Sequence, residues 1–219
     1  MRGAGSLWII AFLSIALQGC VGGTGGILGG GDEIEVPEWE TGDWWLFTFS
    51  TPDFFDDSAK LVVATVDQEE GGTAYMLGIS SEEEARRHAV LNHNPFLGRI
   101  SHSNLGVFEN GVEQAVLSFP LSEKTWSFTL FEKDWTASAN INGEKAYVKA
   151  TSADGGSLTF AYDDDIKFIT SFVRVDSDGA ELLRISLAQS GSDHQGEVHF
   201  IRGRDLLDRE YQNNGPSGD

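Results

Sequence analysis

Apolar and polar residues alternate over short runs along most of this chain, a pattern typical of β-strands with one buried face. In the run TWSFTLF, Trp126, Phe128 and Leu130 fall on one face, and only threonine and serine fall between them. The same period of two predicts strands at 43–50, 60–67, 73–80, 125–131, 145–151, 157–162, 167–175, 181–188 and 197–202. We therefore expect a mainly β domain.

Turn residues separate the predicted strands of the C-terminal half. Asn142-Gly143, Asp154-Gly155-Gly156 and Asp178-Gly179 are combinations that close tight hairpins. Strands joined in this way are antiparallel neighbours. The sequence thus predicts an antiparallel meander that forms a curved sheet, half-barrel or barrel. Because no linker rich in Pro, Ser or Gly interrupts it, we assign residues 36–207 to a single β-rich domain and residues 208–219 to a disordered tail.

One segment, SSEEEARRHAVLN at 81–93, departs from the period of two. Ser81 and Glu84 have the spacing of a capping box, in which each side chain bonds the other residue's backbone N–H. The acidic first turn, followed by Arg86 and Arg87, suits the dipole of a helix. The segment predicts one short α-helix packed on the sheet.

The strand at 43–50 is apolar on both faces. Trp45 shares one face with two phenylalanines, while Trp44 and Leu46 lie on the other. Since an antiparallel sheet usually leaves one face to water, this second face needs a cover. The helix alone would provide it, or a bound apolar ligand would share the task. Our candidate ligand-binding residues are Trp44, Leu46, Ala85, Ala89 and Leu91.

The N-terminus is organised differently. Arg2 precedes an apolar run, Leu7 to Leu17, and small residues follow, which is the layout of a secretory signal. The run is shorter than the roughly 20 apolar residues that a membrane-spanning helix needs. The only cysteine, Cys20, stands between this run and the glycine-rich stretch VGGTGGILGGG. A single cysteine excludes a disulfide within the chain, and a catalytic thiol would need a structured electropositive surrounding.

Leu17-Gln18-Gly19-Cys20 resembles the lipobox of prokaryotic lipoproteins, although Gln18 is larger than the small residue of that motif. The resemblance implies that residues 1–19 are a signal peptide, that Cys20 is the lipid-attachment site, and that residues 20–35 form a tether. The stretch SFPLSEKTWSF, at 118–128, is similar to uncharacterised envelope β-sheet lipoproteins. Both resemblances imply an extracytoplasmic, membrane-anchored location in the cell envelope.

Charge narrows the range of partners. The chain carries a formal charge of −19, with six lysines and nine arginines, and loss of residues 1–19 would make it −20. Such a domain repels nucleic-acid phosphates and anionic lipid headgroups. We therefore expect no nucleic-acid partner, and a membrane contact made through the lipid anchor.

The sequence contains no strong motif for catalysis or for metal binding. His88 and His93 are five residues apart across a predicted helix end and do not share a face, and His102 follows, so we predict no metal site. No G-x-S-x-G elbow or phosphate-binding loop outlines an active centre, and we predict no catalytic residues and no cofactor. The acidic turns could hold Ca²⁺ only weakly because they lack an EF-hand pattern. Their carboxylates are Asp163, Asp164, Asp165, Asp176 and Asp178.

Together these features predict a non-enzymatic binding module for an apolar small molecule or an envelope protein. A structural spacer without a ligand pocket is the alternative. A metal-dependent hydrolase built on the His88–His102 region is a third reading.

Overall fold

The computed structural model describes residues 33–52, 57–69, 72–85, 94–109 and 111–200. The chain divides into two compact units, Met1–Gly30 and Gly31–Asp219, and every described residue belongs to the second. In the described part of the chain, no helix combines the length and the apolarity needed to cross a membrane.

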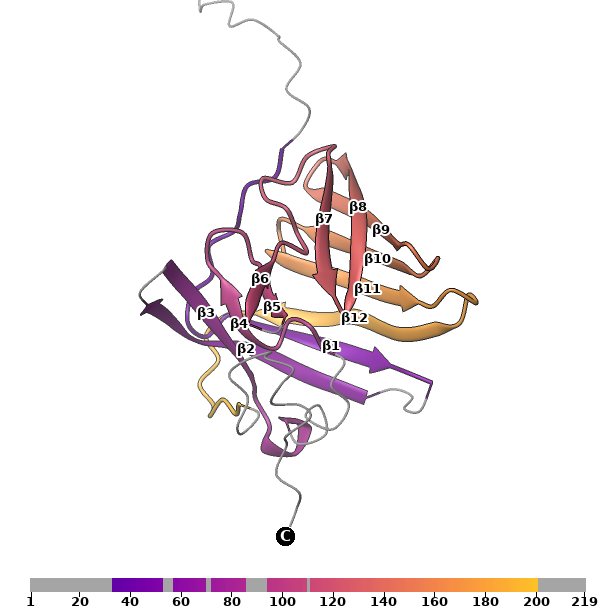
Figure 1. Ribbon diagram of the computed structural model, residues 1–219. Coiled ribbons are helices and arrows are strands. Elements are labelled where there is room, and N and C mark those ends of the chain that lie inside the picture. Colours follow the sequence, from indigo (N-terminus) through magenta and orange to yellow (C-terminus); the bar gives the residue numbers. More distant parts are fainter. Residues whose placement is uncertain (1–32, 53–56, 70–71, 86–93, 110, 201–219) are drawn as a thin grey trace, which may run out of the picture. The chain divides into compact units, whose positions relative to one another are not determined.

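Twelve antiparallel strands form one nearly closed, barrel-like sheet (Figure 1). The first six strands are β1 (Trp44–Ser50), β2 (Asp57–Glu69), β3 (Gly72–Ile79), β4 (Gly98–Ser101), β5 (Val107–Glu109) and β6 (Val112–Gln114). The last six are β7 (Thr125–Leu130), β8 (Lys133–Asn142), β9 (Lys145–Ser152), β10 (Ser157–Asp163), β11 (Phe168–Val175) and β12 (Glu181–Gly191). The predicted antiparallel meander and mainly β fold class are confirmed.

The order of the strands in the sheet is β6-β5-β4-β3-β2-β1-β12-β11-β10-β9-β8-β7. Each strand therefore lies beside its neighbour in sequence, with one exception. β6 and β7 are consecutive in the chain but stand at the two edges of the sheet, whereas the first and last strands, β1 and β12, pair in its middle.

Most of the predicted strands are present, and the hairpin glycines Gly143 and Gly179 take positive φ values of 60° and 86°. β4, β5, β6 and β8 were not predicted. The strand predicted at 197–202 was wrong within its described part, because His199 makes only an isolated bridge with Ile79. β12 already has β1 and β11 on its two sides, so the chain that follows it finds no vacant edge beside β12 to pair with.

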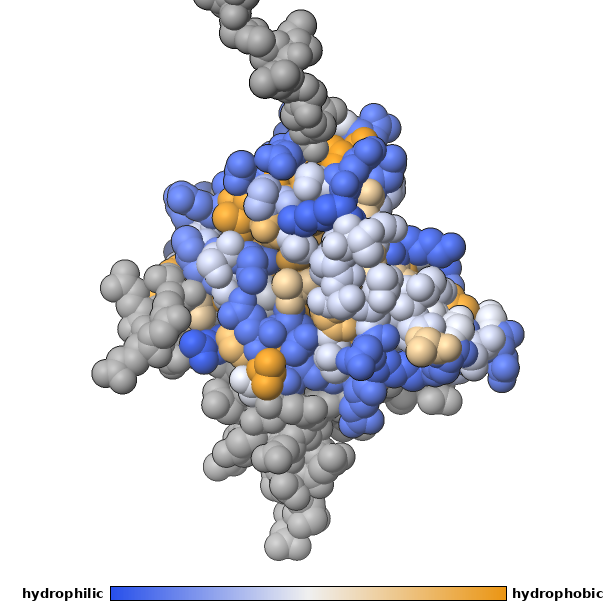
Figure 2. Space-filling model, turned by 45° about the horizontal axis from the view of Figure 1, so that its top comes forward, coloured by the Kyte–Doolittle hydropathy of each residue, from blue (hydrophilic) through white to orange (hydrophobic). Residues whose placement is uncertain are grey.

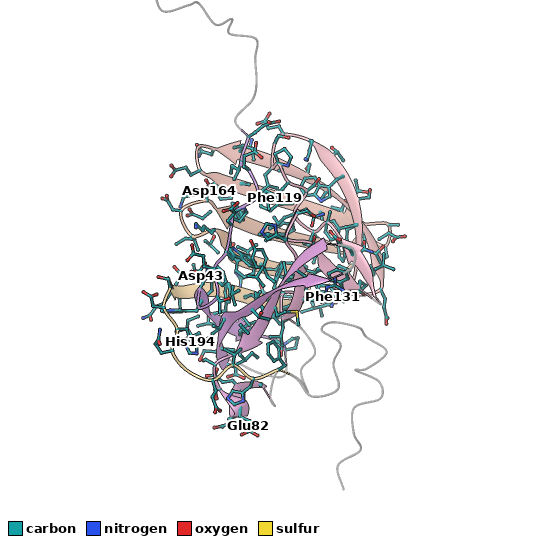
Figure 3. All side chains as sticks on the ribbon, turned by 90° about the vertical axis from the view of Figure 1, so that its left-hand side faces the viewer. Asp43, Glu82, Phe119, Phe131, Asp164 and His194 are labelled. Atoms are coloured by element: carbon teal, nitrogen blue, oxygen red, sulfur yellow. The ribbon has the colours of Figure 1, made fainter. Side chains whose placement is uncertain are left out.

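Aromatic side chains fill the centre of the space that the strands enclose (Figure 3). The ring centroid of Trp39 lies 4.9 Å from those of Trp45 and Tyr75 and 5.0 Å from that of Phe168. Phe96, from the connection between β3 and β4, packs edge-on against Phe168 at 5.6 Å. Rings at these distances are in van der Waals contact, so the centre is a packed core.

The segment before β1 is part of this core. Ile34 pairs with Leu121 of the loop 115–124, and both side chains are buried. The backbone N–H of Trp39 donates to the hydroxyl of Tyr75, and its indole Nε1 donates to the carbonyl of Lys167. Ile34, which we assigned to the tether, is thus joined to the folded domain.

The predicted helix is described only at its start. Residues 82–85 are helical, and the N–H of Glu84 donates to Ser81 Oγ at 3.3 Å, which is one of the two bonds of a capping box. Ala85 is buried within the core cluster. The rest of the predicted helix, 86–93, lies outside the described residues.

Candidate functional site

The candidate residue Trp44 lies on the outer face of β1, and the chain itself covers much of it. Lys60 Nζ stands 4.3 Å from the ring centroid, a cation–π contact, and Trp44 Nε1 donates to the carbonyl of Ser192 at 3.2 Å. Gly191 pairs with Trp44, and a Cβ there would come within 2.8 Å of the indole. The half-buried ring is therefore held between Lys60 and the segment that follows β12.

The other candidates are placed differently. Leu46 shares the outer face with Trp44 and is half-buried, whereas Ala85 belongs to the core cluster inside the sheet. Ala89 and Leu91 lie outside the described residues, as does Cys20. A ligand site on the Trp44 face stays a prediction.

The described histidines make structural contacts. The ring of His102 lies 4.9 Å from that of Tyr75, and the backbone N–H of His194 donates to the carbonyl of Gly42. His88 and His93 fall outside the described residues. Within the described ranges, no three side chains of His, Cys, Asp or Glu are grouped closely enough to hold a metal ion.

The carboxylates of the acidic turns hold those turns in shape. Asp163 pairs with Lys145 at 2.8 Å, and this contact raises the pKa of the lysine. Asp176 Oδ1 accepts from the N–H groups of Asp178 and Ala180 at 2.9 and 2.8 Å. These oxygens serve the local turn geometry, as Asx residues commonly do.

A feature that the sequence did not reveal is the junction between β6 and β7, which we call the seam. Among the described residues, no backbone–backbone hydrogen bond links β7 to β6 or to the loop 115–124. Two side chains bridge the seam instead. Gln114 Oε1 accepts from the N–H of Thr129 at 2.7 Å, and Glu109 Oε1 accepts from the N–H of Glu132 at 3.0 Å.

The bond from Thr129 shows which backbone groups of β7 face the seam. β7 pairs with β8 without a register shift, and strand residues alternate in the direction of their N–H and C=O groups. Thr125 and Ser127 therefore present their backbone to the seam as Thr129 does, and both residues are exposed. These are the unpaired groups of a sheet edge.

The side chains along the seam are apolar, acidic and hydroxylic. Val112 of β6 is 60% exposed, and Glu113 beside it is also exposed. On the β7 side, Trp126 is half-buried, and its Nε1 is buried without a hydrogen-bond partner in the described structure. Buried N–H groups usually find an acceptor, so the indole lies in an incompletely satisfied environment.

No protein-family model matches the chain, and no curated protein matches it significantly.

Proposed function

We propose that the protein is an envelope lipoprotein, cleaved before Cys20 and anchored by lipid on that thiol, whose β domain is a non-enzymatic binding module for a protein partner. The lipobox-like sequence before Cys20 supports the anchor. We choose a protein partner over a small molecule because the aromatic rings at the centre of the domain pack against one another. These rings belong to Trp39, Trp45, Tyr75 and Phe168.

A barrel-like sheet that carries an apolar molecule needs an internal cavity, typically about 300–1,000 Å³. Here the central rings touch one another instead, and side chains from the loops add to them. Recognition therefore takes place on the outside. On the face shown in Figure 2, hydrophobic side chains are scattered among hydrophilic ones and form no broad patch, which favours a partner bound through polar and backbone contacts.

The anchor is tested by replacing its thiol. Cys20→Ser removes the nucleophile that would carry the lipid, so we expect the protein to lose its lipid mass and its resistance to extraction from the membrane fraction. Intact-mass measurement of the purified full chain and membrane fractionation provide the two readouts. Gln18→Ala, which brings the motif closer to the lipobox, is the matched control and should be processed at least as completely as the parent. A mature chain that starts elsewhere than Cys20, or carries no lipid, contradicts the anchor.

The binding module is tested in the host envelope. A photocrosslinking residue placed singly at Val112, Thr125, Tyr147 or Asp178 samples the seam, the outer face of β9 two strands from β7, and the turn between β11 and β12. A partner protein should crosslink reproducibly from neighbouring positions and not from the others. A structural spacer would give no specific product from any position, and that result would overturn the binding module.

A further inference from the structure

We propose that the seam is the docking site of this module, and that its occupant is an extended, positively charged segment of the partner protein that adds as a strand along β7. The proposal rests on the proposed function and specifies the site and the kind of segment bound. Extended peptides join exposed sheet edges through main-chain hydrogen bonds, while their alternating side chains provide specificity.

The unpaired backbone of β7 favours the addition of a strand. The N–H and C=O groups of Thr125 and Ser127 face the seam with no backbone partner among the described residues. Natural sheets usually protect such edges with proline, charge, a bulge or a covering segment. β7 has no proline and no charged residue along its length, and its pairing with β8 is regular. β7 thus stands at an edge of the sheet but lacks the features that usually protect an edge strand.

The opposite side of the seam also favours strand addition, because β6 is too short to cover β7. β6 ends at Gln114, and the chain then turns inward, since the side chains of Val116 and Leu117 are fully buried. At Thr129 the Gln114 side chain supplies the acceptor that a neighbouring strand would otherwise offer. Beyond that point, toward Ser127 and Thr125, the described structure supplies no such acceptor.

The charge of the domain favours a basic segment as the occupant. Glu123 before β7 and Asp134 on β8 are exposed beside this edge, and Glu113 is exposed on β6 across the seam. Lys124 lies between Glu123 and β7, and its Nζ donates to the carbonyl of Pro120. The whole chain is strongly acidic, so two copies meeting edge to edge would bring like charges together. A second copy is therefore disfavoured, whereas lysine or arginine residues on an incoming segment would be attracted.

The alternation of faces predicts the pattern of that segment. On β7, Trp126 and Phe128 point inward while Ser127 points outward. An added strand would place every second residue toward Trp126 and Val112 and the others toward Glu113 and solvent. We therefore expect small or apolar residues to alternate with basic ones.

The experiment uses the full mature chain in nonionic detergent and the probe acetyl-Lys-Val-Lys-Val-Lys-Val-Lys-amide. At saturating peptide, amide hydrogen exchange at Ser127 and Thr125 should slow by about tenfold, which corresponds to one net hydrogen bond. The matched peptide with aspartate in place of lysine should produce no slowing. Unchanged exchange at both amides with the lysine peptide would overturn the proposal.

A proline variant isolates the backbone contact. Ser127→Pro removes an N–H that faces the seam and not β8, a substitution that edge strands tolerate. We expect it to weaken binding of the lysine peptide by about tenfold or more. Ser127→Ala keeps the N–H and should bind within about twofold of the parent. Equal binding by both variants would refute strand addition along β7.

Charge variants keep the test decisive if Ser127→Pro does not fold. Glu113→Gln with Glu123→Gln should weaken the lysine peptide several-fold and flatten its salt dependence, and Asp178→Asn in a distant turn should not. Envelope crosslinking separates the two proposals. A partner crosslinked from Tyr147 alone would refute the seam and leave the binding module standing, whereas no crosslink from any position would refute the module itself.

Discussion

The six strands β1–β6 and the six strands β7–β12 meet at two junctions that are built very differently. At the first, β1 and β12 pair from Trp44 opposite Gly191 to Ser50 opposite Arg184, with one register shift. At the second, the seam, the side chains of Gln114 and Glu109 replace the backbone ladder.

Strand length explains the difference. β12 has eleven residues and covers the whole of β1, whereas β6 has three residues and ends where the chain turns into the core. A junction made of a backbone ladder buries its polar groups in pairs, while one bridged by side chains leaves part of its edge available. The first junction therefore serves stability, and the second is the place where the sheet can accept another segment.

The largest expected effect comes from breaking the first junction. Phe47 on β1 is fully buried and lies opposite Leu187 of β12. Phe47→Ala should lower the free energy of unfolding by about 3–5 kcal/mol, because the cavity cannot collapse fully in a packed aromatic core. Val112→Ala at the seam removes an exposed side chain and should change stability by less than about 0.5 kcal/mol. Denaturant titration of both variants measures the contrast, and similar losses would show that the two junctions contribute alike.

A smaller effect is expected from opening the bridged end of the seam. Gln114→Ala removes the acceptor for the N–H of Thr129, a contact worth about 0.5–1.5 kcal/mol. Amide exchange at Thr129 should become faster while exchange along β1 stays unchanged. Gln114→Glu retains an acceptor oxygen and should restore the slow exchange. Fast exchange at Thr129 already in the parent would show that the bridge does not form in solution.

The smallest effect concerns the turn that follows β7, which Glu109 contacts across the seam. Beyond this turn, Lys133 of β8 and Ser152 of β9 both donate to Asp154, which lies in the turn after β9. These bonds hold the pKa of the Asp154 carboxyl well below its usual range. Because the folded-state pKa is depressed, the contribution to stability is present above the ordinary value of about 3.9 and is lost as the pH falls through the folded-state pKa. An NMR titration should place the Asp154 midpoint below that ordinary value. Lys133→Met should raise it, whereas Lys149→Met should leave it in place.

Much of the fold was predictable because local patterns encode it. Strands with large inward residues, such as β7 with Trp126 and Phe128, have a clear period of two. β8 was missed because its inward positions include Ala137 and Ala139, which differ little in hydropathy from their neighbours. β5 and β6 have three residues each, too few for any period to be recognised.

The sites were less predictable because they depend on what lies beside each strand. The sequence identified the two apolar faces of β1 but not the cover of Trp44, which comes from Lys60 on the next strand and from the segment after the last strand. The seam is a missing pairing, and a missing pairing leaves no local pattern. The apparent strand at 197–202 shows the converse, since a strand-like run forms no strand where the strand before it, β12, already has a neighbour on each side.

The pairing of β1 with β12 also determines how late in synthesis the domain can complete its sheet. The hydrogen bond from Trp44 to Ser192 joins residues 148 positions apart, so β1 keeps one edge open until nearly the whole domain has emerged. Synthesis at roughly 5–20 residues per second leaves that edge unpaired for on the order of ten seconds. Contacts so distant in sequence also slow the final closure. The nascent chain thus stays incompletely folded throughout synthesis, and that delay is compatible with the export across a membrane that we propose.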